Sequence, residues 1–269
     1  MTIIFSLFVL FFGACIGSFL NCLAWRLYHD ESLWGRSKCP NCHQKISWYD
    51  NVPLLSYLSL GGKCRHCKEK IAFQYFLVEL VTASLFLLAF SRYFPNAGLE
   101  LILAPNFIAL NSQAFWLMFR DWLLISFLVV IFIMDLRWMV VADEISLPAI
   151  VIIFLVNLYL GSSWSLLLSS AIIGAGFFAL QYAVSHGRWV GGGDIRIGAL
   201  MGVALGWPLT LVALMLAYFS GALIGVILIA TKKKGLKSPL PFGVFLAPAT
   251  LVALWWGGVI WQWYVNLLF

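Results

Sequence analysis

The stretch Gly191-Gly192-Gly193-Asp194 places three glycines and a carboxylate between two long apolar runs. Asp135 occupies a comparable position, because it ends the apolar run 126–134. An ionisable side chain at the edge of a membrane span is energetically costly, so it indicates a functional role by default. Two such acids suggest a pair of carboxylates that work together, and the rest of the chain can be interpreted as the scaffold that holds them.

The composition of the chain is that of a membrane protein. Of its 269 residues, 62% are hydrophobic and only 10% are charged, and the mean hydropathy is +0.95. Apolar segments of about 20 residues, separated by turn signals, are typical of membrane-spanning helices. The sequence therefore predicts an all-α polytopic membrane protein with about eight transmembrane helices, at residues 3–25, 72–92, 116–136, 144–160, 164–185, 195–207, 209–230 and 242–267.

The basic residues predict the orientation of these spans. If the N-terminus lies outside, the four connecting segments on the cytoplasmic side hold 15 of the 17 lysines and arginines. Only Arg92 and Arg120 are then external, in agreement with the positive-inside rule. The net charge of +6 thus reflects the lysines and arginines of the cytoplasmic segments. We expect a multi-pass protein of the bacterial inner membrane that is surrounded by lipid and has no nucleic-acid partner.

Residues 26–71 form a polar segment with two C-x-x-C motifs, Cys39 to Cys42 and Cys64 to Cys67. Four thiolates at this spacing can close a tetrahedron around zinc, as in a zinc ribbon. Two disulfides are the alternative, but they require an oxidising compartment, whereas the charge pattern places this segment in the cytoplasm. We expect a small cytoplasmic zinc-ribbon-like loop, with a structural zinc because four cysteines leave no open coordination position.

The third and sixth spans are expected to be short. Only 13 uncharged residues separate Asp121 from Asp135, and the sixth span, 195–207, also has 13 residues. Each covers about 20 Å against a hydrocarbon thickness of about 30 Å. Asp135 and Asp194 are then both recessed from the cytoplasmic surface, at a similar depth in the membrane. In the alternative interpretation, Asp194 only caps the sixth helix and Asp135 pairs with Arg137 at the lipid surface.

The motifs of the chain, taken in order, resemble those of the bacterial prepilin leader peptidases, also called type IV prepilin peptidase/N-methyltransferases. These enzymes are GxGD-type intramembrane aspartic proteases, and the resemblance covers nearly the whole chain. It is carried by Gly17-Ser18-Phe19-Leu20-Asn21, the two C-x-x-C motifs, Trp48-Tyr49-Asp50-Asn51-Val52-Pro53, Tyr75 to Glu79, Asp135 and Gly191-x-Gly193-Asp194.

The resemblance implies that Asp135 and Asp194 are catalytic. The implied substrate is a type IV prepilin or secretion pseudopilin, whose leader is cut on the cytoplasmic side. Members with this zinc loop also methylate the new N-terminus, so the resemblance further implies a bifunctional enzyme that uses S-adenosylmethionine. Asp143, in Val141-Ala142-Asp143, stands where the family usually has Leu-Pro-Asp or Ile-Pro-Asn. We interpret Asp143 as that trailing polar residue and not as a catalyst.

Gly191, Gly192 and Gly193 are expected to contact substrate, because glycines lack side-chain bulk and let an extended peptide approach the carboxylate. We expect residues 1–92 to form a methyltransferase region around the zinc loop, and residues 93–269 a six-span aspartic peptidase domain.

Proteins of other classes are alternatives to a peptidase. A proton-coupled polytopic transporter would also place carboxylates in the membrane, but the halves 1–135 and 136–269 show no repeat symmetry. A membrane-anchored zinc-ribbon binding module would leave the two aspartates unexplained.

Overall fold

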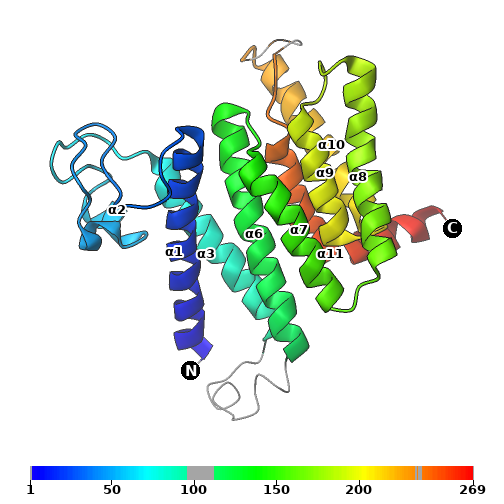
Figure 1. Ribbon diagram of the computed structural model, residues 1–269, viewed down its shortest axis with the longest axis horizontal. Helices are drawn as coiled ribbons and strands as arrows, with labels where there is room; N and C mark the ends of the chain where they lie inside the picture. The colour runs from blue at the N-terminus through cyan, green and yellow to red at the C-terminus, as the bar shows by residue number, and fades with distance from the viewer. Residues whose placement is uncertain (1, 96–111, 234, 236–237, 269) are drawn as a thin grey trace. The chain divides into compact units, whose positions relative to one another are not determined.

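The computed structural model describes residues 2–95, 112–233, 235 and 238–268. In this part of the chain there are no strands, and the only β-bridges are Lys38 with Lys45 and Lys63 with Lys70. The all-α prediction is confirmed. The helices are α1 Thr2–Tyr28, η1 Trp48–Asn51 (a 3-10 helix), α2 Leu55–Ser59, α3 Phe73–Tyr93, α6 Ser112–Trp138, α7 Asp143–Tyr159, α8 Trp164–Ser185, α9 Gly192–Leu205, α10 Leu209–Ala230 and α11 Gly243–Leu268 (Figure 1).

Six of the described helices are long and apolar enough to cross a membrane, namely α1, α3, α6, α8, α10 and α11. The chain is therefore a multi-pass membrane protein. Every segment counted from the sequence corresponds to a helix, but α7 has 17 residues and α9 has 14, which is shorter than the six spans. Eight crossings thus remain a prediction, whereas the shortness expected of the sixth segment is found in α9.

The expected shortness of the third span is wrong. Helix α6 has 27 residues and runs through Asp121 and past Asp135. Asp121 is fully buried, and its two carboxylate oxygens accept hydrogen bonds from the Arg120 guanidinium at 2.6 Å and from the Tyr93 hydroxyl at 2.9 Å. An acid satisfied in this way continues a helix as readily as a neutral residue, so the spacing of charges underestimates the length of the span.

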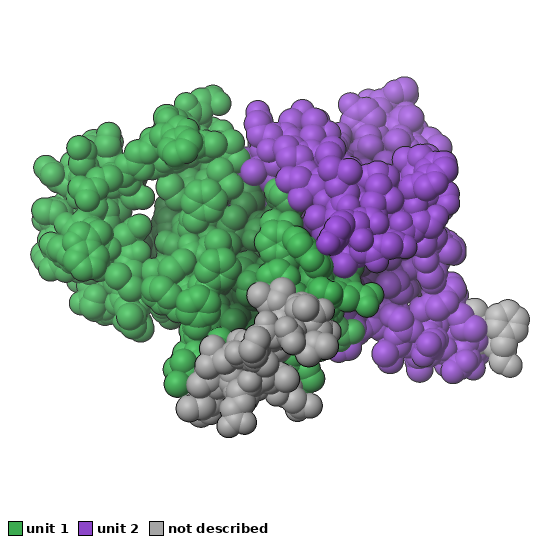
Figure 2. Space-filling model, turned by 60° about the horizontal axis from the view of Figure 1, so that its bottom comes forward, with its two compact units in different colours: residues 1–130 green, residues 131–269 purple. Residues whose placement is uncertain are grey.

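The chain forms two compact units, residues 1–130 and 131–269, which divide within α6 (Figure 2). In the first unit α1 packs along α3. A Cβ atom on Gly13 would lie 2.8 Å from the Ala83 Cα atom, and one on Gly17 would lie 2.9 Å from the Glu79 Cα atom. Glycine therefore permits the close approach of these two backbones, as is common between membrane helices.

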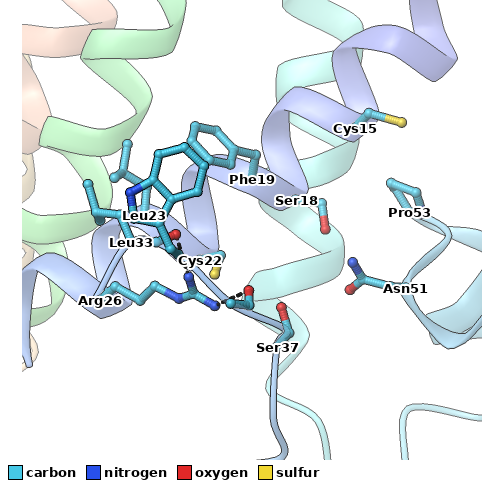
Figure 3. Close-up of a pocket in the computed structure, with 12 residues that line it drawn as sticks. Cys15, Ser18, Phe19, Cys22, Leu23, Arg26, Leu33, Ser37, Asn51 and Pro53 are labelled. Atoms are coloured by element: carbon cyan, nitrogen blue, oxygen red, sulfur yellow. Dashed lines mark hydrogen bonds between the residues drawn. The ribbon is translucent and has the colours of Figure 1, made fainter. Parts of the chain in front are cut away.

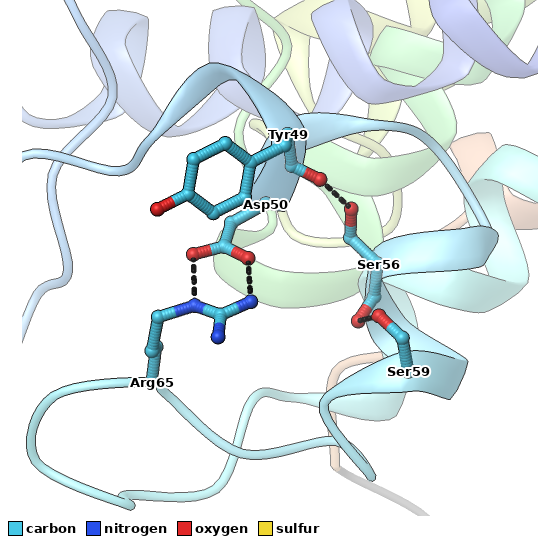
Figure 4. A network of polar contacts seen from close by, with 5 residues as sticks. All are labelled: Tyr49, Asp50, Ser56, Ser59 and Arg65. Carbon is cyan, nitrogen blue, oxygen red and sulfur yellow. Dashed lines mark hydrogen bonds and ion pairs between the residues drawn. The ribbon is translucent and has the colours of Figure 1, made fainter.

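The polar loop of the first unit is held together by side chains that lie far apart in its sequence. Arg65 donates from Nε and Nη2 to the two carboxylate oxygens of Asp50, at 2.8 and 2.6 Å (Figure 4). This guanidinium holds the pKa of Asp50 below its usual value. The Ser56 hydroxyl donates to the Tyr49 carbonyl at 3.0 Å, so helix α2 and the second C-x-x-C motif are both attached to η1.

In the second unit α9 is held by its neighbours on two sides. Where α8 crosses α9, a Cβ atom on Gly198 would lie 2.4 Å from the Gly174 carbonyl oxygen, so only glycine fits this crossing. The Asn157 side chain of α7, which is 3% exposed, donates from Nδ2 to the Val203 carbonyl of α9 at 2.6 Å. These contacts fix α9, and with it the position of Asp194 at its start.

Candidate functional site

Asp135 lies in the last turn of α6 and is 6% exposed. Its Oδ2 atom accepts a hydrogen bond of 3.1 Å from the backbone N–H of Val244, at the start of α11. A Cβ atom on the preceding residue, Gly243, would lie only 2.8 Å from that oxygen. The first N–H groups of a helix have no partners within the helix and carry partial positive charge. The start of α11 therefore supplies a donor and a favourable field for this carboxylate.

Asp194 is the third residue of α9 and is 8% exposed. Its Oδ2 atom accepts a hydrogen bond of 2.9 Å from the backbone N–H of Gly191, the N-cap residue of the helix. A carboxylate at this position satisfies one of the free N–H groups at the helix start. Asp194 is therefore not the N-cap residue that the alternative interpretation made it, but its carboxylate binds the N–H group of the residue that is.

Asp194 also lies near Asp135, close enough for the charge of Asp135 to act on its carboxyl group. Packing agrees with this proximity, since the Gly243 position that touches Asp135 also lies 3.0 Å from Ile197, one turn beyond Asp194. The alternative pairing with Arg137 is not seen, because Asp135 forms no ion pair among the described residues. The bond of Asp194 to the N-cap residue of α9 is thus compatible with a position near Asp135.

The three glycines before Asp194 have different surroundings. A Cβ atom on Gly193 would lie 2.6 Å from a methyl carbon of Val141, so this position is closely packed. Gly192 has no such neighbour within 4 Å, and Gly191 provides the N–H that binds Asp194. Gly192 is therefore the position with open space at its α-carbon, while Gly191 and Gly193 also have roles within the protein itself.

Asp143, at the start of α7, has a partner of its own. It forms an ion pair with Arg196 of α9, and the same Arg196 Nη1 atom donates to the Val141 carbonyl at 3.3 Å. Arg196 thus fastens the link between α6 and α7 to the first turn of α9. This arrangement agrees with the interpretation of Asp143 as a polar residue that is separate from the pair.

Gly243 and Val244 were missed as site residues in the sequence, where they only begin the last span. The hydrogen bond from Val244 joins residues 109 positions apart. A local signal does exist, because Pro239, Pro241 and Gly243 precede an apolar run and mark the start of a helix. Nothing in that signal shows which acid the helix start meets.

The four predicted cysteine ligands come together in the first unit. Their Sγ atoms all lie within 4.8 Å of one another, and Cys39 Sγ lies 3.9 Å from Cys67 Sγ. Zinc–sulfur bonds of about 2.3 Å in a tetrahedron place sulfur atoms about 3.8 Å apart. All four are free thiols. The cluster therefore has the donors and the spacing to hold a metal ion, and the disulfide alternative is not seen.

The two C-x-x-C motifs fold in the same way. In the first, the Cys39 N–H donates to the Gln44 carbonyl at 3.0 Å, and in the second the Cys64 N–H donates to the Glu69 carbonyl at 2.8 Å. Backbone N–H groups of Cys67 and His66 also point to the Cys64 thiol and lower its pKa. A turn that directs N–H groups at sulfur stabilises the thiolate form that a metal requires.

Glu79 of α3 is 7% exposed, and its partners were not identified in the sequence. Its Oε2 atom accepts a hydrogen bond of 2.7 Å from the backbone N–H of Leu54, and the Ser18 hydroxyl is a second partner. Leu54 has a φ of +62°, which leucine rarely adopts. Glu79 thus fixes the loop to α3 and connects it with Ser18 of α1.

Two family models match the chain, one in each part that contains a candidate site. The Bacterial Peptidase A24 N-terminal domain matches residues 11–93, which include the four cysteines. The Type IV leader peptidase family matches residues 122–226, which include Asp135 and Asp194.

Curated relatives match over nearly the full chain. A protein of Aeromonas hydrophila named prepilin leader peptidase/N-methyltransferase is 33% identical, over 97% of this chain and 94% of the relative. Proteins of the same name from Bacillus subtilis and Pseudomonas aeruginosa are 31% and 29% identical, and cover 95% and 97% of this chain and 96% and 94% of the relatives. No solved structure gives a significant match.

Proposed function

Because this chain belongs to the type IV leader peptidase family, we propose that it is a membrane aspartic endopeptidase that removes the leader peptide from type IV prepilins or pseudopilins. The observation that carries this proposal is the pair Asp135 and Asp194, two buried carboxylates that are each bound by a backbone N–H group at a helix start. A proton-coupled transporter is not favoured, because the curated relatives are named as peptidases.

The proposed chemistry needs only the two carboxylates and a water molecule. Two carboxylates close together in a poorly solvated site do not both ionise easily, so the pair holds one proton. The ionised member accepts a proton from the water that attacks the scissile carbonyl, while the protonated member donates its proton to the carbonyl oxygen. When the tetrahedral intermediate collapses, the first member passes the proton from water to the leaving amine, and the second member regains a proton from the hydroxyl group as the new carboxyl forms. The N–H groups of Val244 and Gly191 hold the two side chains in place through this cycle.

Gly191, Gly192 and Gly193 are proposed to border the path of the substrate. The open space at Gly192 supports an approach of the extended substrate backbone at that position. The packing of Val141 on Gly193 supports a second role, in which the link between α6 and α7 is kept against the start of α9. Leader cleavage then depends on both glycines for different reasons.

The proposed activity includes methylation of the new N-terminus, as the names of the relatives indicate for those proteins. Residues 1–92 would carry this activity and residues 93–269 the peptidase. The match of a separate N-terminal family model to residues 11–93 supports this division, although the compact units divide later, after Val130. S-adenosylmethionine would supply the methyl group.

The metal of the cysteine cluster is proposed to be a structural zinc held by Cys39, Cys42, Cys64 and Cys67. The tetrahedral spacing of sulfur atoms supports zinc. Four thiolates fill its coordination sphere, so zinc would hold the two C-x-x-C turns together and take no part in peptide hydrolysis. The cluster and the aspartate pair are proposed to lie on the cytoplasmic side, which the distribution of lysine and arginine supports.

Co-expression of the chain with candidate prepilins tests the proposed function. We expect one or more of them to lose the leader, read as a shift on a gel and as a new N-terminus by mass spectrometry. In a second arm, Asp194→Asn is supplied with a mature pilin whose leader has already been removed. If methylation resides in residues 1–92, this variant still methylates it. Loss of methylation there would place both activities in one site.

A further inference from the structure

A cavity of about 450 Å³ lies in the first unit, between α1 and two segments of the polar loop (Figure 3). This volume is within the range of small-molecule sites, about 300–1,000 Å³. The α1 residues that face the cavity are spaced by three or four positions and so lie on one side of the helix. The cavity is lined by Cys15, Ser18, Phe19, Cys22, Leu23, Arg26, Leu33, Trp34, Gly35, Ser37, Asn51 and Pro53.

Arg26 brings a buried positive charge to this cavity. Its side chain is 9% exposed, and its guanidinium donates to the carbonyls of Ser32, Leu33 and Gly35 at 3.2, 2.6 and 3.0 Å. All three acceptors are neutral, and no carboxylate among the described residues forms an ion pair with Arg26. A guanidinium has five N–H donors, so donors remain beyond these three bonds. A buried charge without a counterion is costly, which points to an anionic group in the ligand.

The rest of the lining suits a ligand with an aromatic ring and several polar atoms. Ser37 and Asn51 offer a hydroxyl and an amide. Trp34 is 91% exposed, which is unusual for so large an apolar side chain. An indole ring in contact with solvent beside a cavity is a stacking surface for a flat heterocycle such as a purine base.

We propose that this cavity binds S-adenosylmethionine, with Arg26 pairing with the carboxylate of its methionine part and Trp34 stacking on its adenine. The inference rests on the proposed methyltransferase activity and assigns that activity to a definite place. When bound, the cofactor supplies a methyl group: the lone pair of the acceptor amine forms the N–C bond as the S–C bond breaks. The sulfonium becomes a neutral thioether, and the ammonium proton passes to water.

The test measures binding of radiolabelled S-adenosylmethionine to the purified full-length protein, by equilibrium dialysis and by ultraviolet cross-linking. Arg26→Gln should weaken binding by about tenfold or more, because a charge-assisted hydrogen bond to the ligand is lost. Trp34→Ala should weaken it by about tenfold through loss of stacking. The exposed Trp34 side chain can be removed with little effect on folding. Trp34→Ala therefore tests the proposal even if Arg26→Gln is unstable.

Matched controls lie on the same loop outside the cavity. Arg36→Gln and Trp48→Ala remove an exposed arginine and a 76% exposed tryptophan that do not line it. Both should bind S-adenosylmethionine within about twofold of wild type. Both controls should also retain leader cleavage, which uses the aspartate pair of the second unit.

Three results would overturn the proposal. If wild type methylates a mature pilin while Trp34→Ala and Arg26→Gln bind the cofactor normally, the site is elsewhere and the proposed methylation stands. If wild type neither binds S-adenosylmethionine nor methylates, the methyltransferase part of the proposed function fails as well. If Arg26→Gln weakens binding of phosphatidylglycerol vesicles but not of S-adenosylmethionine, the cavity is a site for an anionic lipid headgroup.

Discussion

The substitution Gly243→Ala tests whether the start of α11 positions Asp135. A Cβ atom at this position would lie 2.8 Å from Asp135 Oδ2, 3.2 Å from its Cγ and 3.0 Å from a methyl carbon of Ile197. Ordinary contact begins at 3.4 Å, so the carboxylate or the helix start must move by about 0.6 Å, the difference between 3.4 and 2.8 Å. Asp135 belongs to α6 and Ile197 to α9, so a shift of the added methyl group away from one of them does not relieve its contact with the other.

This displacement is large enough to affect the chemistry. The Val244 hydrogen bond of 3.1 Å would lengthen to as much as about 3.7 Å, which is no longer a hydrogen bond. Loss of a hydrogen bond to a charged group costs about 1.5–3 kcal/mol, and a misplacement of about 1 Å at a catalytic group costs about 100-fold in rate. We expect Gly243→Ala to lower kcat for leader cleavage by about 10- to 100-fold, with a smaller change in KM.

The assay is a time course of leader cleavage with purified variants at equal protein concentration, after thermal unfolding has shown that each variant is folded. Gly258→Ala is the matched control, because it lies on the same helix and an added Cβ atom there meets nothing within 4 Å. It should cleave like wild type. The reasoning is refuted if Gly243→Ala cleaves within about twofold of wild type, or if Gly258→Ala loses as much activity.

Further predictions concern other contacts. Gly193→Ala should reduce cleavage, because its methyl group meets Val141, and the double variant with Val141→Ala should regain activity in the same assay if packing is the cause. Purified protein should hold about one zinc per chain by metal analysis, and Cys39→Ser should lose that zinc and loosen residues 26–71 in limited proteolysis; a zinc-free wild type would contradict this. Arg65 lowers the pKa of Asp50, so their ion pair is present above that pKa and is lost as the pH falls through it. Hydrogen-exchange protection of residues 48–51 should therefore fall in acid, and Arg65→Gln should show the lower protection already near neutral pH.

Features that depend on local sequence could be predicted. Each apolar segment folds as a helix, because its length and composition decide that outcome in a membrane. The cysteine cluster also forms as expected, since each C-x-x-C turn brings its own two thiols together and only one long-range contact remains. Asp135 and Asp194 could be singled out because acids at the ends of apolar runs are rare.

Features that depend on tertiary contacts could not be predicted from the sequence. Asp121 looked like the end of a span, yet its burial with Arg120 and Tyr93 lets α6 continue. Glu79 is bound by the N–H of Leu54, a residue whose positive φ has no signal in the sequence. The contact of α11 with Asp135 crosses 109 positions, and periodicity within either helix says nothing about it. In each case the local sequence identifies the residue, whereas its contact partner is determined by the tertiary packing.

The central claim, that Asp135 and Asp194 act as one catalytic pair, is tested most directly by leader cleavage in three single variants. Asp135→Asn and Asp194→Asn should each lose at least about 100-fold of the rate, because one carboxylate cannot act as both acid and base. Asp143→Asn should retain a substantial part of it, because it loses only an exposed ion pair with Arg196. An inactive Asp143→Asn together with an active Asp135→Asn would contradict the claim.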